Sequence, residues 1–339
     1  MVMKKSFGIK DIAKMLGISV STVSRALRDA YDVNPETKKR VLELTEKLNF
    51  KLNKNASALA SGNTKNIGVV IPFITNYYFS TVISGIQEEA YNQGYNIILY
   101  VTNDDIEREK KLIENIATSS LDGLLISISS NSHIVEHFET MMRSGLPIVF
   151  FDRVPQHIQA SKVVQSDFDG AYQATTYLIE KGYDRIAHIA GPSELSFTQE
   201  RLRGYLQAHT DAKVPHHKEY VIFSGFGQSH GFDDTKALLS LPQPPNAIFA
   251  VNDRKAVGAI QALNQACIRV GQDFGVIGFT NDPISTVIEP NLTTIEEPAF
   301  EIGRQSCQLL IRHIKNKDFE PREILIPGRL IERQSVRSD

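Results

Sequence analysis

The stretch IKDIAKMLGISVSTVSRAL, residues 9–27, repeats apolar side chains at helical spacing on both sides of a glycine. In its first half, the apolar positions that share one helical face are Ile9, Ile12, Ala13 and Leu16. Gly17 suits the end of a helix, and the apolar positions after it are Ile18, Val23, Ala26 and Leu27. The stretch therefore predicts two short helices joined by a tight turn.

A third helix is expected after this pair. Asn34 is a good helix cap, and Pro35 fits the first helical position. Apolar residues then mark an inner face at Val41, Leu44 and Leu48. Two helices joined by a glycine-containing turn and followed by a third form a helix-turn-helix arrangement. A small helical domain with a polar outer face would explain the same periodicity without any ligand.

The second helix carries many hydroxyl groups, which are poor choices for a helix interior because they compete for backbone hydrogen bonds. In a helix-turn-helix, the N-terminal residues of this helix reach base edges in the major groove of DNA. The side chains predicted to contact DNA from this helix are Ser19, Val20, Ser21, Thr22, Ser24 and Arg25.

The distribution of charge favours the same interpretation. Residues 1–62 hold 12 Lys and Arg against 6 Asp and Glu, a net charge of +6, whereas the remaining residues carry −8. A basic head on an acidic body indicates a module that binds nucleic acid. A solvated basic surface would give the same imbalance. The segment NKNASALASG, residues 53–62, follows and predicts a linker that becomes helical only when something holds it, because isolated short helices are marginal in water.

From residue 67 onward, β-rich apolar runs alternate with amphipathic helical segments. NIGVVIP, NIILYVT, DGLLISI and LPIVFFD form one series, and RIAHIAG, EYVIFSG, NAIFAVN and DFGVIGF form a second. The pattern predicts an α/β fold of two doubly wound parallel-sheet subdomains, preceded by the small all-α head. Ligands bind at the carboxyl ends of such strands, so a cleft between the subdomains is the expected site.

One motif points to an enzyme. GQSHG at 227–231 matches the G-x-S-x-G nucleophile elbow and falls between a predicted strand and a predicted helix. A hydrolase of this kind needs an acidic residue and then a histidine downstream, but the histidine available beyond His230 is His313, inside a predicted helix. A glycine-rich loop in which Ser229 starts a helix explains the motif without catalysis. We therefore predict that the protein is not an enzyme.

The totals of the 339 residues indicate a soluble protein, with 42% hydrophobic and 22% charged residues. Cys267 and Cys307 are too few for a disulfide framework and are expected to be buried free thiols, with no metal site. The chain shows neither a signal-peptide pattern nor an apolar run approaching 18 residues. We expect a cytoplasmic protein without membrane contact.

These residues resemble the lactose/galactose repressor (LacI/GalR) family. IKDIAKMLGISVSTVSRAL is similar to the head-piece signature of the family, and NKNASALASG is similar to its hinge helix. The match continues in order through NIGVVIP, PIVFFDR, LIEKGYDRIAHIAGP, ERLRGY, AIFAVND, VIGFTND and PNLTTIEEP. The resemblance implies a bacterial transcriptional repressor that binds a palindromic operator as a homodimer, with allosteric control by a small-molecule effector and no cofactor.

The resemblance also implies the domain boundaries. They are a head at 1–52, a hinge at 53–65, an N-terminal core subdomain at 66–164 plus 294–326, and a C-terminal core subdomain at 165–293 plus 327–339. The core is expected to have the fold of periplasmic sugar-binding proteins, with crossovers near 163–167, 291–295 and 326–329. The C-terminal ERQSVRSD shows no leucine heptad, which favours a dimer over a tetramer.

In the head, Val20 and Ser21 fall where the family reads bases, and Arg25 matches its recognition-helix arginine. In the hinge, the positions implied to contact DNA are Asn53, Lys54, Asn55, Ala56 and Leu59. Leu59 matches a leucine that family members wedge into the minor groove. The alternative is that Leu59 packs on the core.

Nine positions fall where the family holds its ligand: Tyr78, Phe79, Asp152, Arg153, Arg201, Phe226, Asn252, Asp253 and Thr280. An aromatic side chain with Asn, Asp and Arg suits a polyol, so a carbohydrate is the expected effector. Asp253 has a second interpretation, as a cap of the helix that follows it. Thr280 and Asn281 replace an Asp-rich pair, which removes a strong acceptor and prevents direct transfer of effector identity from well-known members.

A different functional class remains open at this point. A solute-binding protein of a transport system would share the predicted core. It would need a signal peptide, and it would not carry residues 1–62.

Overall fold

The computed structural model describes residues 7–27, 29–48, 50, 63–116, 120–130, 136–155, 157–316 and 318–337. The chain divides into two compact units, Met1–Thr64 and Lys65–Asp339, which we call the head and the core.

The described part of the head folds as three helices, α1 (Ile9–Leu16), α2 (Val20–Leu27) and α3 (Pro35–Lys47). The buried apolar residues that hold them together are Ile12, Ala13, Val23, Ala26 and Val41. Gly17 ends α1 with a left-handed φ of 66°. The Oγ of Ser19 accepts the Thr22 amide at 3.0 Å, and the Oδ1 of Asn34 accepts the Glu36 amide at 2.8 Å. The predicted helix-turn-helix is confirmed.

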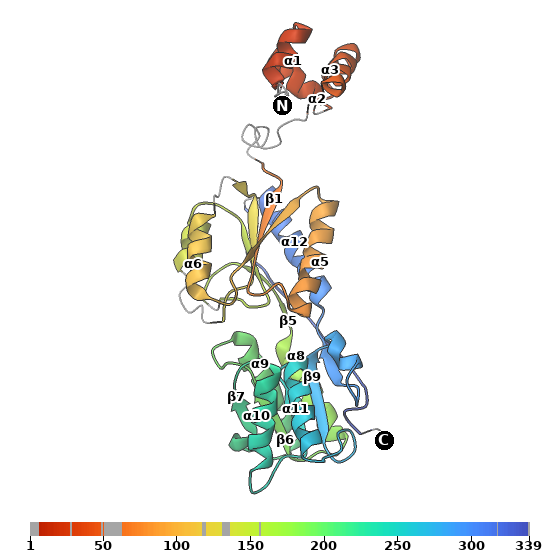
Figure 1. Cartoon of the computed structure of the whole chain (residues 1–339). Helices are drawn as coiled ribbons and strands as arrows, with labels where there is room; N and C mark the ends of the chain where they lie inside the picture. The colour runs from red at the N-terminus through yellow and green to blue at the C-terminus, as the bar shows by residue number, and fades with distance from the viewer. Residues whose placement is uncertain are drawn as a thin grey trace. The chain divides into compact units, whose positions relative to one another are not determined.

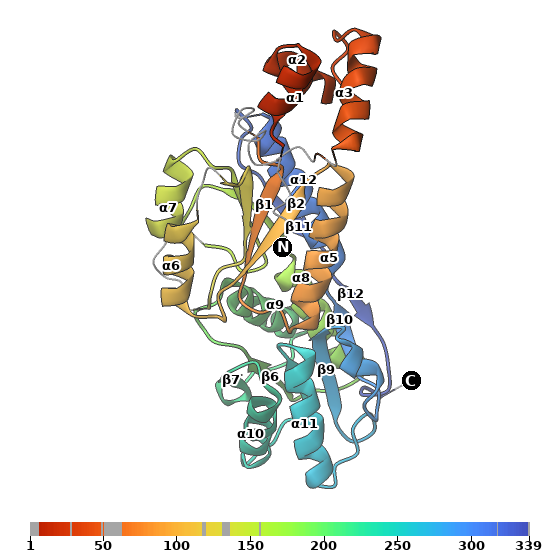
Figure 2. The same ribbon diagram turned by 45° about the horizontal axis from the view of Figure 1, so that its top comes forward.

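The first sheet of the core consists of parallel strands in the order β11-β5-β4-β3-β1-β2. Their bounds are β1 Asn66–Ile71, β2 Asn96–Val101, β3 Gly123–Ile126, β4 Ile148–Phe151, β5 Ser161–Gln165 and β11 Glu323–Ile326. One face packs on α5 (Tyr77–Asn92) and α12 (Ala299–Lys315). The other face packs on α6 (Ile106–Asn115) and α7 (Glu136–Arg143), so the sheet is covered on both sides (Figure 1; Figure 2).

The second sheet has the order β12-β10-β9-β8-β6-β7, with β12 antiparallel to β10. Its strands are β6 Ile186–Ala190, β7 Val221–Phe223, β8 Ala247–Ala250, β9 Gly275–Thr280, β10 Thr293–Glu296 and β12 Arg329–Ile331. The helices α8 (Asp167–Glu180) and α9 (Ser196–Ala212) cover one face. The helices α10 (Gln228–Leu239) and α11 (Asp253–Gln265) cover the other. Short 3-10 helices, η2 (Lys218–Tyr220) and η3 (Pro283–Thr286), lie in the connections. Two doubly wound sheets, preceded in the sequence by a helical head, are as predicted.

The described chain passes between the sheets at three places: at Ser166, at Glu297–Pro298 and at Pro327–Gly328. The expected second crossover at 291–295, with residue 294 in the first subdomain, is wrong. Residues 293–296 form β10, which pairs in parallel with β9 of the second sheet. The apolar pattern of a strand does not tell which sheet the strand joins.

Two further expectations can be compared with the structure. Cys307 is buried as predicted, but Cys267 is exposed because it follows the end of α11. Among the described residues, no helix combines the length and the apolar character needed to cross a membrane.

Candidate functional site

The N-terminal end of α2 presents small polar side chains on the surface of the head. The Oγ of Ser19 lies 2.7 Å from the Oγ of Ser21 and 2.8 Å from the Oγ1 of Thr22. Val20 is 41% exposed, and Ser24 is partly buried one turn further on. This end of the helix is therefore free to approach a partner while Val23 and Ala26 hold its other face to the head.

Arg25 lies on the same exposed side of α2. Its guanidinium forms an ion pair with Asp32, and its side chain is 53% exposed. Arg25 is therefore accessible but has a partner in the head, which a phosphate or a base would have to replace.

The hinge positions predicted to contact DNA, Asn53, Lys54, Asn55, Ala56 and Leu59, lie outside the described residues. Their predicted roles, including the two interpretations of Leu59, remain predictions.

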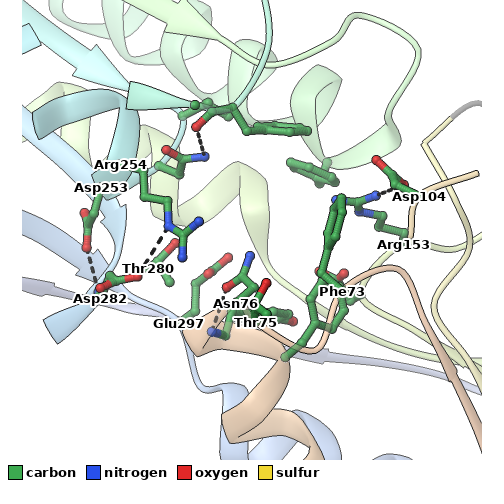
Figure 3. A pocket seen from close by; sticks show the side chains of 18 of the residues that line it. Phe73, Thr75, Asn76, Asp104, Arg153, Asp253, Arg254, Thr280, Asp282 and Glu297 are labelled. Atoms are coloured by element: carbon green, nitrogen blue, oxygen red, sulfur yellow. Dashed lines mark hydrogen bonds and ion pairs between the residues drawn. The ribbon is translucent and has the colours of Figure 1, made fainter. Parts of the chain in front are cut away.

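In the core, a pocket of about 390 Å³ lies where the carboxyl ends of strands from both sheets meet. The residues predicted to bind the effector all line this pocket: Tyr78, Phe79, Asp152, Arg153, Arg201, Phe226, Asn252, Asp253 and Thr280. Figure 3 shows Asp104 and Arg153 on one side and Arg254, Asp253 and Asp282 on the opposite side. The volume suits a small molecule.

The aromatic part of the pocket comes from α5, α9 and the loop before α10. Phe226 stacks on Phe197 with ring centroids 5.8 Å apart and an interplanar angle of 23°. The Arg153 guanidinium lies 5.9 Å from the Phe226 ring. Tyr78 and Phe79 enter from the first turn of α5, which begins at Tyr77 because the Asn76 side chain accepts the Tyr78 amide at 2.9 Å. An aromatic plate of this kind can pack against an apolar ligand face.

Charged groups line the remainder of the pocket. The carboxylates are Asp104, Asp152, Asp253, Asp282 and Glu297, and the cations are Arg153, Arg201 and Arg254. Each of these cations has a carboxylate partner: Arg153–Asp104 at 2.7 Å, Arg201–Glu297 at 2.7 Å and Arg254–Asp282 at 4.0 Å. The lining is therefore richer in acceptors than in free donors.

Asp152 ends β4 with a left-handed φ of 58°, a conformation that Asp tolerates better than most residues. It accepts the Ser127 hydroxyl at 3.1 Å. Burial raises the pKa of Asp152 to about 6, against the opposing effect of Arg153. Burial, together with the Asp152 carboxylate, also raises the pKa of Tyr78.

The two interpretations of Asp253 can be compared at the start of α11. The cap is Asn252, whose Oδ1 accepts the Lys255 amide at 2.8 Å. The Asp253 carboxylate instead accepts the Thr294 hydroxyl at 2.6 Å and the Asp282 amide at 2.7 Å. Burial raises the pKa of Asp253 to about 8. Asp253 therefore holds β9 and β10 together and does not cap the helix.

Thr280 and Asn281 have φ angles of 120° and 59°. A β-branched residue at such a φ is strained, and strain of this kind clusters at functional sites. Asn281 turns away from the pocket wall to donate to Glu296 at 2.9 Å and to accept from Arg333 at 2.6 Å. The carboxylate at this end of β9 is provided by Asp282, which the sequence analysis did not assign.

Other lining residues were also missed, namely Phe73, Thr75, Asn76, Asp104, Phe197, Gly227, Val251, Arg254, Asp282 and Glu297. All of them lie in the loop or the first helical turn after a strand, which is the signal that would have found them. Phe197 gives the weakest signal, since it lies in the first turn of α9 and furthest along the chain from its strand, whereas Glu297 directly follows β10.

The GQSHG motif has a packing role. A Cβ on Gly231 would overlap the backbone carbonyl of Lys255 in α11, so glycine lets α10 and α11 approach closely. Ser229 is exposed in the first turn of α10, and the His313 ring lies 2.7 Å from Ser161 in the other subdomain.

The described residues contain no cluster of three or more His, Cys, Asp or Glu side chains arranged for a metal.

Comparison with known protein families gives two matches. Residues 8–53 match the model for bacterial regulatory proteins of the lacI family, and residues 175–336 match that for the periplasmic binding protein-like domain. The HTH-type transcriptional repressor PurR of Aliivibrio fischeri is 32% identical over 332 residues, which cover 97% of this chain and 98% of that protein. The PurR of Vibrio atlanticus is 30% identical over the same shares of both chains.

Solved structures share the fold. The lac repressor dimer bound to operator and the anti-inducer ONPF superposes with a TM-score of 0.86 at 24% identity, over 98% of this chain and all of that one. A LacI family transcriptional regulator from Enterococcus faecium with bound ribose gives a TM-score of 0.69 at 29% identity, over 80% of this chain and 98% of that one. The relatives are transcriptional repressors, and this agrees with the prediction that the chain is not an enzyme.

Proposed function

Because the chain belongs to the lacI family of bacterial regulatory proteins, and is thus a DNA-binding transcriptional repressor, we propose that a small molecule in the core pocket controls its affinity for operator DNA. The observation that carries this proposal is the pocket itself. Its lining comes from both subdomains, so a ligand that contacts both sides favours one subdomain orientation over others. The protein would act in the bacterial cytoplasm as a homodimer on a two-fold symmetric site.

We propose that the DNA contacts come from α2 and the hinge. The residues concerned are Ser19, Val20, Ser21, Thr22, Ser24, Arg25, Asn53, Lys54, Asn55, Ala56 and Leu59. The exposure of the N-terminal end of α2 supports the assignment of the residues from Ser19 to Arg25. For Leu59 we favour the minor-groove wedge, in which an apolar side chain opens a base step.

We propose that the effector is a sugar or a sugar derivative. Ionised carboxylates accept hydrogen bonds and do not donate them, so the acidic side chains of the lining other than Asp253, whose pKa is raised to about 8, favour a ligand with many donors. Sugar hydroxyls supply such donors, and the apolar face of a sugar ring suits the Phe226 plate. The bound ribose of the Enterococcus faecium regulator is consistent with this class.

A purine is the second candidate, and the relatives favour it. The similar repressors from Aliivibrio and Vibrio carry the name PurR, which suggests a purine-type effector. A planar base would also stack on Phe226. It presents fewer donors to the carboxylates than a sugar does, and for this reason we place it second.

A thermal-shift measurement separates the two classes, since a ligand that binds the folded state raises the melting temperature. The probes are D-ribose, D-glucose and cellobiose against adenine and hypoxanthine. We expect at least one sugar to stabilise the wild type and the Phe223→Ala variant, whose ring is exposed outside the pocket, but not Phe226→Ala. Stabilisation by purines alone would replace the sugar by the second candidate, and no shift with any probe would contradict both.

A further inference from the structure

The Phe226 ring of the pocket is carried by a short loop and lies against a glycine. The loop, residues 224–227, joins β7 to α10. It brings the ring over the backbone of Gly191, directly after β6, where a Cβ would overlap the ring. The ring also stacks on Phe197. The position of this aromatic plate therefore depends on where the loop and the end of β6 lie.

The ammonium group of Lys255 binds both of these places. Lys255 lies in the first turn of α11, and its side chain is 0% exposed. Its Nζ donates to the carbonyl oxygen of Ala190, the last residue of β6, and to the Oγ of Ser224 at 2.7 Å. The third partner is the Asp234 carboxylate of α10, at 2.8 Å. Each of the three ammonium hydrogens therefore has an acceptor.

Ser224 is the residue through which the loop is attached. Its hydroxyl donates to Asp234 at 2.7 Å and accepts from Lys255, so it depends on both members of the ion pair. The Asp234 side chain is only 9% exposed. A buried charge that loses a partner is costly, and a movement of the loop would take a partner away from both charges. Hydrogen bonds to charged groups are strong, so this attachment opposes displacement of the loop.

The start of α11 contacts the loop at a second place. The Oδ1 of Asn252 accepts the Lys255 amide at 2.8 Å, while its Nδ2 donates to the Phe226 carbonyl at 3.3 Å. One turn further on, a Cβ on Gly258 would overlap the carbonyl of Gln228. The helix that carries Lys255 is therefore in contact with the chain at the plate residue and just after it.

We propose that Lys255 is a positioning residue of the effector site, which fixes the Phe226 ring through Ser224 on one side and Ala190 on the other. Lys255 itself is not among the residues that line the pocket. A ring that is held in place before a ligand arrives costs that ligand less ordering entropy, so Lys255 strengthens binding without touching the ligand. The inference rests on the proposed function for its ligand, but its test requires neither ligand nor operator.

The sequence contains no tryptophan, so Phe226→Trp introduces a single fluorescent reporter at the plate. Acrylamide quenching of the full chain measures how accessible this reporter is. Phe223→Trp is the reference for an accessible ring, because Phe223 is 43% exposed at the end of β7. We expect the tryptophan of Phe226→Trp to be quenched much less than that of Phe223→Trp. Equal quenching of the two would overturn the proposal, since the ring would then not be held.

Two changes are then added separately to Phe226→Trp. Lys255→Met removes the ammonium group at similar side-chain length. Ser224→Ala removes the attachment of the loop but leaves the ion pair between Lys255 and Asp234 in place. We expect each change to shift the equilibrium toward a displaced, quenchable ring by about tenfold or more, the effect of losing a hydrogen bond to a charged group.

The matched controls are Lys236→Met and Ser229→Ala, because both side chains are exposed on α10. We expect them to keep the quenching of Phe226→Trp, and an equal effect in the controls would overturn the proposal. A purely structural role of Lys255 would lower the melting temperature of Lys255→Met and leave its quenching unchanged, which would also overturn it.

Unchanged quenching in Ser224→Ala overturns the proposal as well. This variant keeps the buried ion pair, so it decides the question if Lys255→Met does not melt cooperatively. A thermal-shift screen without any hit would leave these results unaffected, so failure of the proposed function is distinguishable.

Discussion

At the scale of single residues, the DNA-binding end of α2 depends on Arg25. The remaining exposed side chains there are short, so they select bases only modestly. Among the side chains assigned to this end of α2, Arg25 is the one long enough to reach a guanine edge or a phosphate. In the absence of DNA, its guanidinium forms an ion pair with Asp32.

We predict that Arg25→Ala weakens operator binding by about 1–3 kcal/mol, the usual contribution of one such contact. The measurement is fluorescence anisotropy with an operator selected from random-sequence DNA. Lys39→Ala is the control, because Lys39 is exposed on α3 and is not among the assigned contacts. Equal affinities of the wild type and Arg25→Ala would show that Arg25 does not contact DNA.

The buried Asp253 carboxylate makes stability depend on pH. Its pKa is raised to about 8, whereas the unfolded chain releases the proton near the usual value of 3.8. The folded state therefore binds more protons between these values, and wild-type stability falls as the pH rises through this window. We predict that Asp253→Asn gains stability relative to the wild type between pH 5 and pH 8. Urea unfolding at pH 5 and at pH 8 measures the free energy of unfolding of both proteins. If the difference between Asp253→Asn and the wild type is the same at both pH values, the burial argument is refuted.

At the scale of elements, glycines set the distances between paired helices. A Cβ on Gly85 of α5 would overlap the carbonyl of Phe300 in α12, and one on Gly303 of α12 would overlap the carbonyl of Val82. Gly231 and Gly258 form the same reciprocal arrangement between α10 and α11. In both helix pairs, the two backbones are in contact at the glycines, because any larger side chain there would push the helices apart.

Gly85→Ala should therefore destabilise the core by about 1–3 kcal/mol, the usual cost of overpacking, although alanine favours a helix more than glycine does. Ser84→Ala is the matched control, since Ser84 is exposed in the same turn. Denaturant unfolding followed by circular dichroism gives both free energies. A Gly85→Ala variant as stable as the wild type would mean that α5 and α12 can separate freely.

Sequence patterns predicted the elements better than their assembly. Apolar runs and helical spacing predicted the strands, the head and the lining at strand ends, because these depend on local periodicity and on a general rule for parallel sheets. The sheet to which β10 belongs depends on its pairing with β9 rather than on local pattern. The closure of Arg201 by Asp167 and Glu297 depends on residues 34 and 96 positions away. The packing role of Gly231 in the GQSHG motif was not predicted for the same reason, since its partner Lys255 lies in another helix.

At the scale of the whole molecule, we assign operator binding to the basic head with the hinge, and effector binding to the acidic core. The two compact units predict that residues 65–339 alone keep the pocket and lose operator binding. Thermal shift with the sugar that stabilises the full chain, and anisotropy with the operator, test the two statements separately. Operator binding by the core alone would contradict the assignment of DNA contacts to the head and hinge.

The central claim is that occupancy of the core pocket changes the affinity of the head for DNA. The direct measurement is the operator dissociation constant of the full chain with and without the stabilising ligand, in the wild type and in Phe226→Ala. We predict a change of about 5–150-fold in the wild type, the range of typical coupling free energies, and no change in Phe226→Ala. A ligand that stabilises the core but leaves the operator dissociation constant of the wild type unchanged would contradict the account.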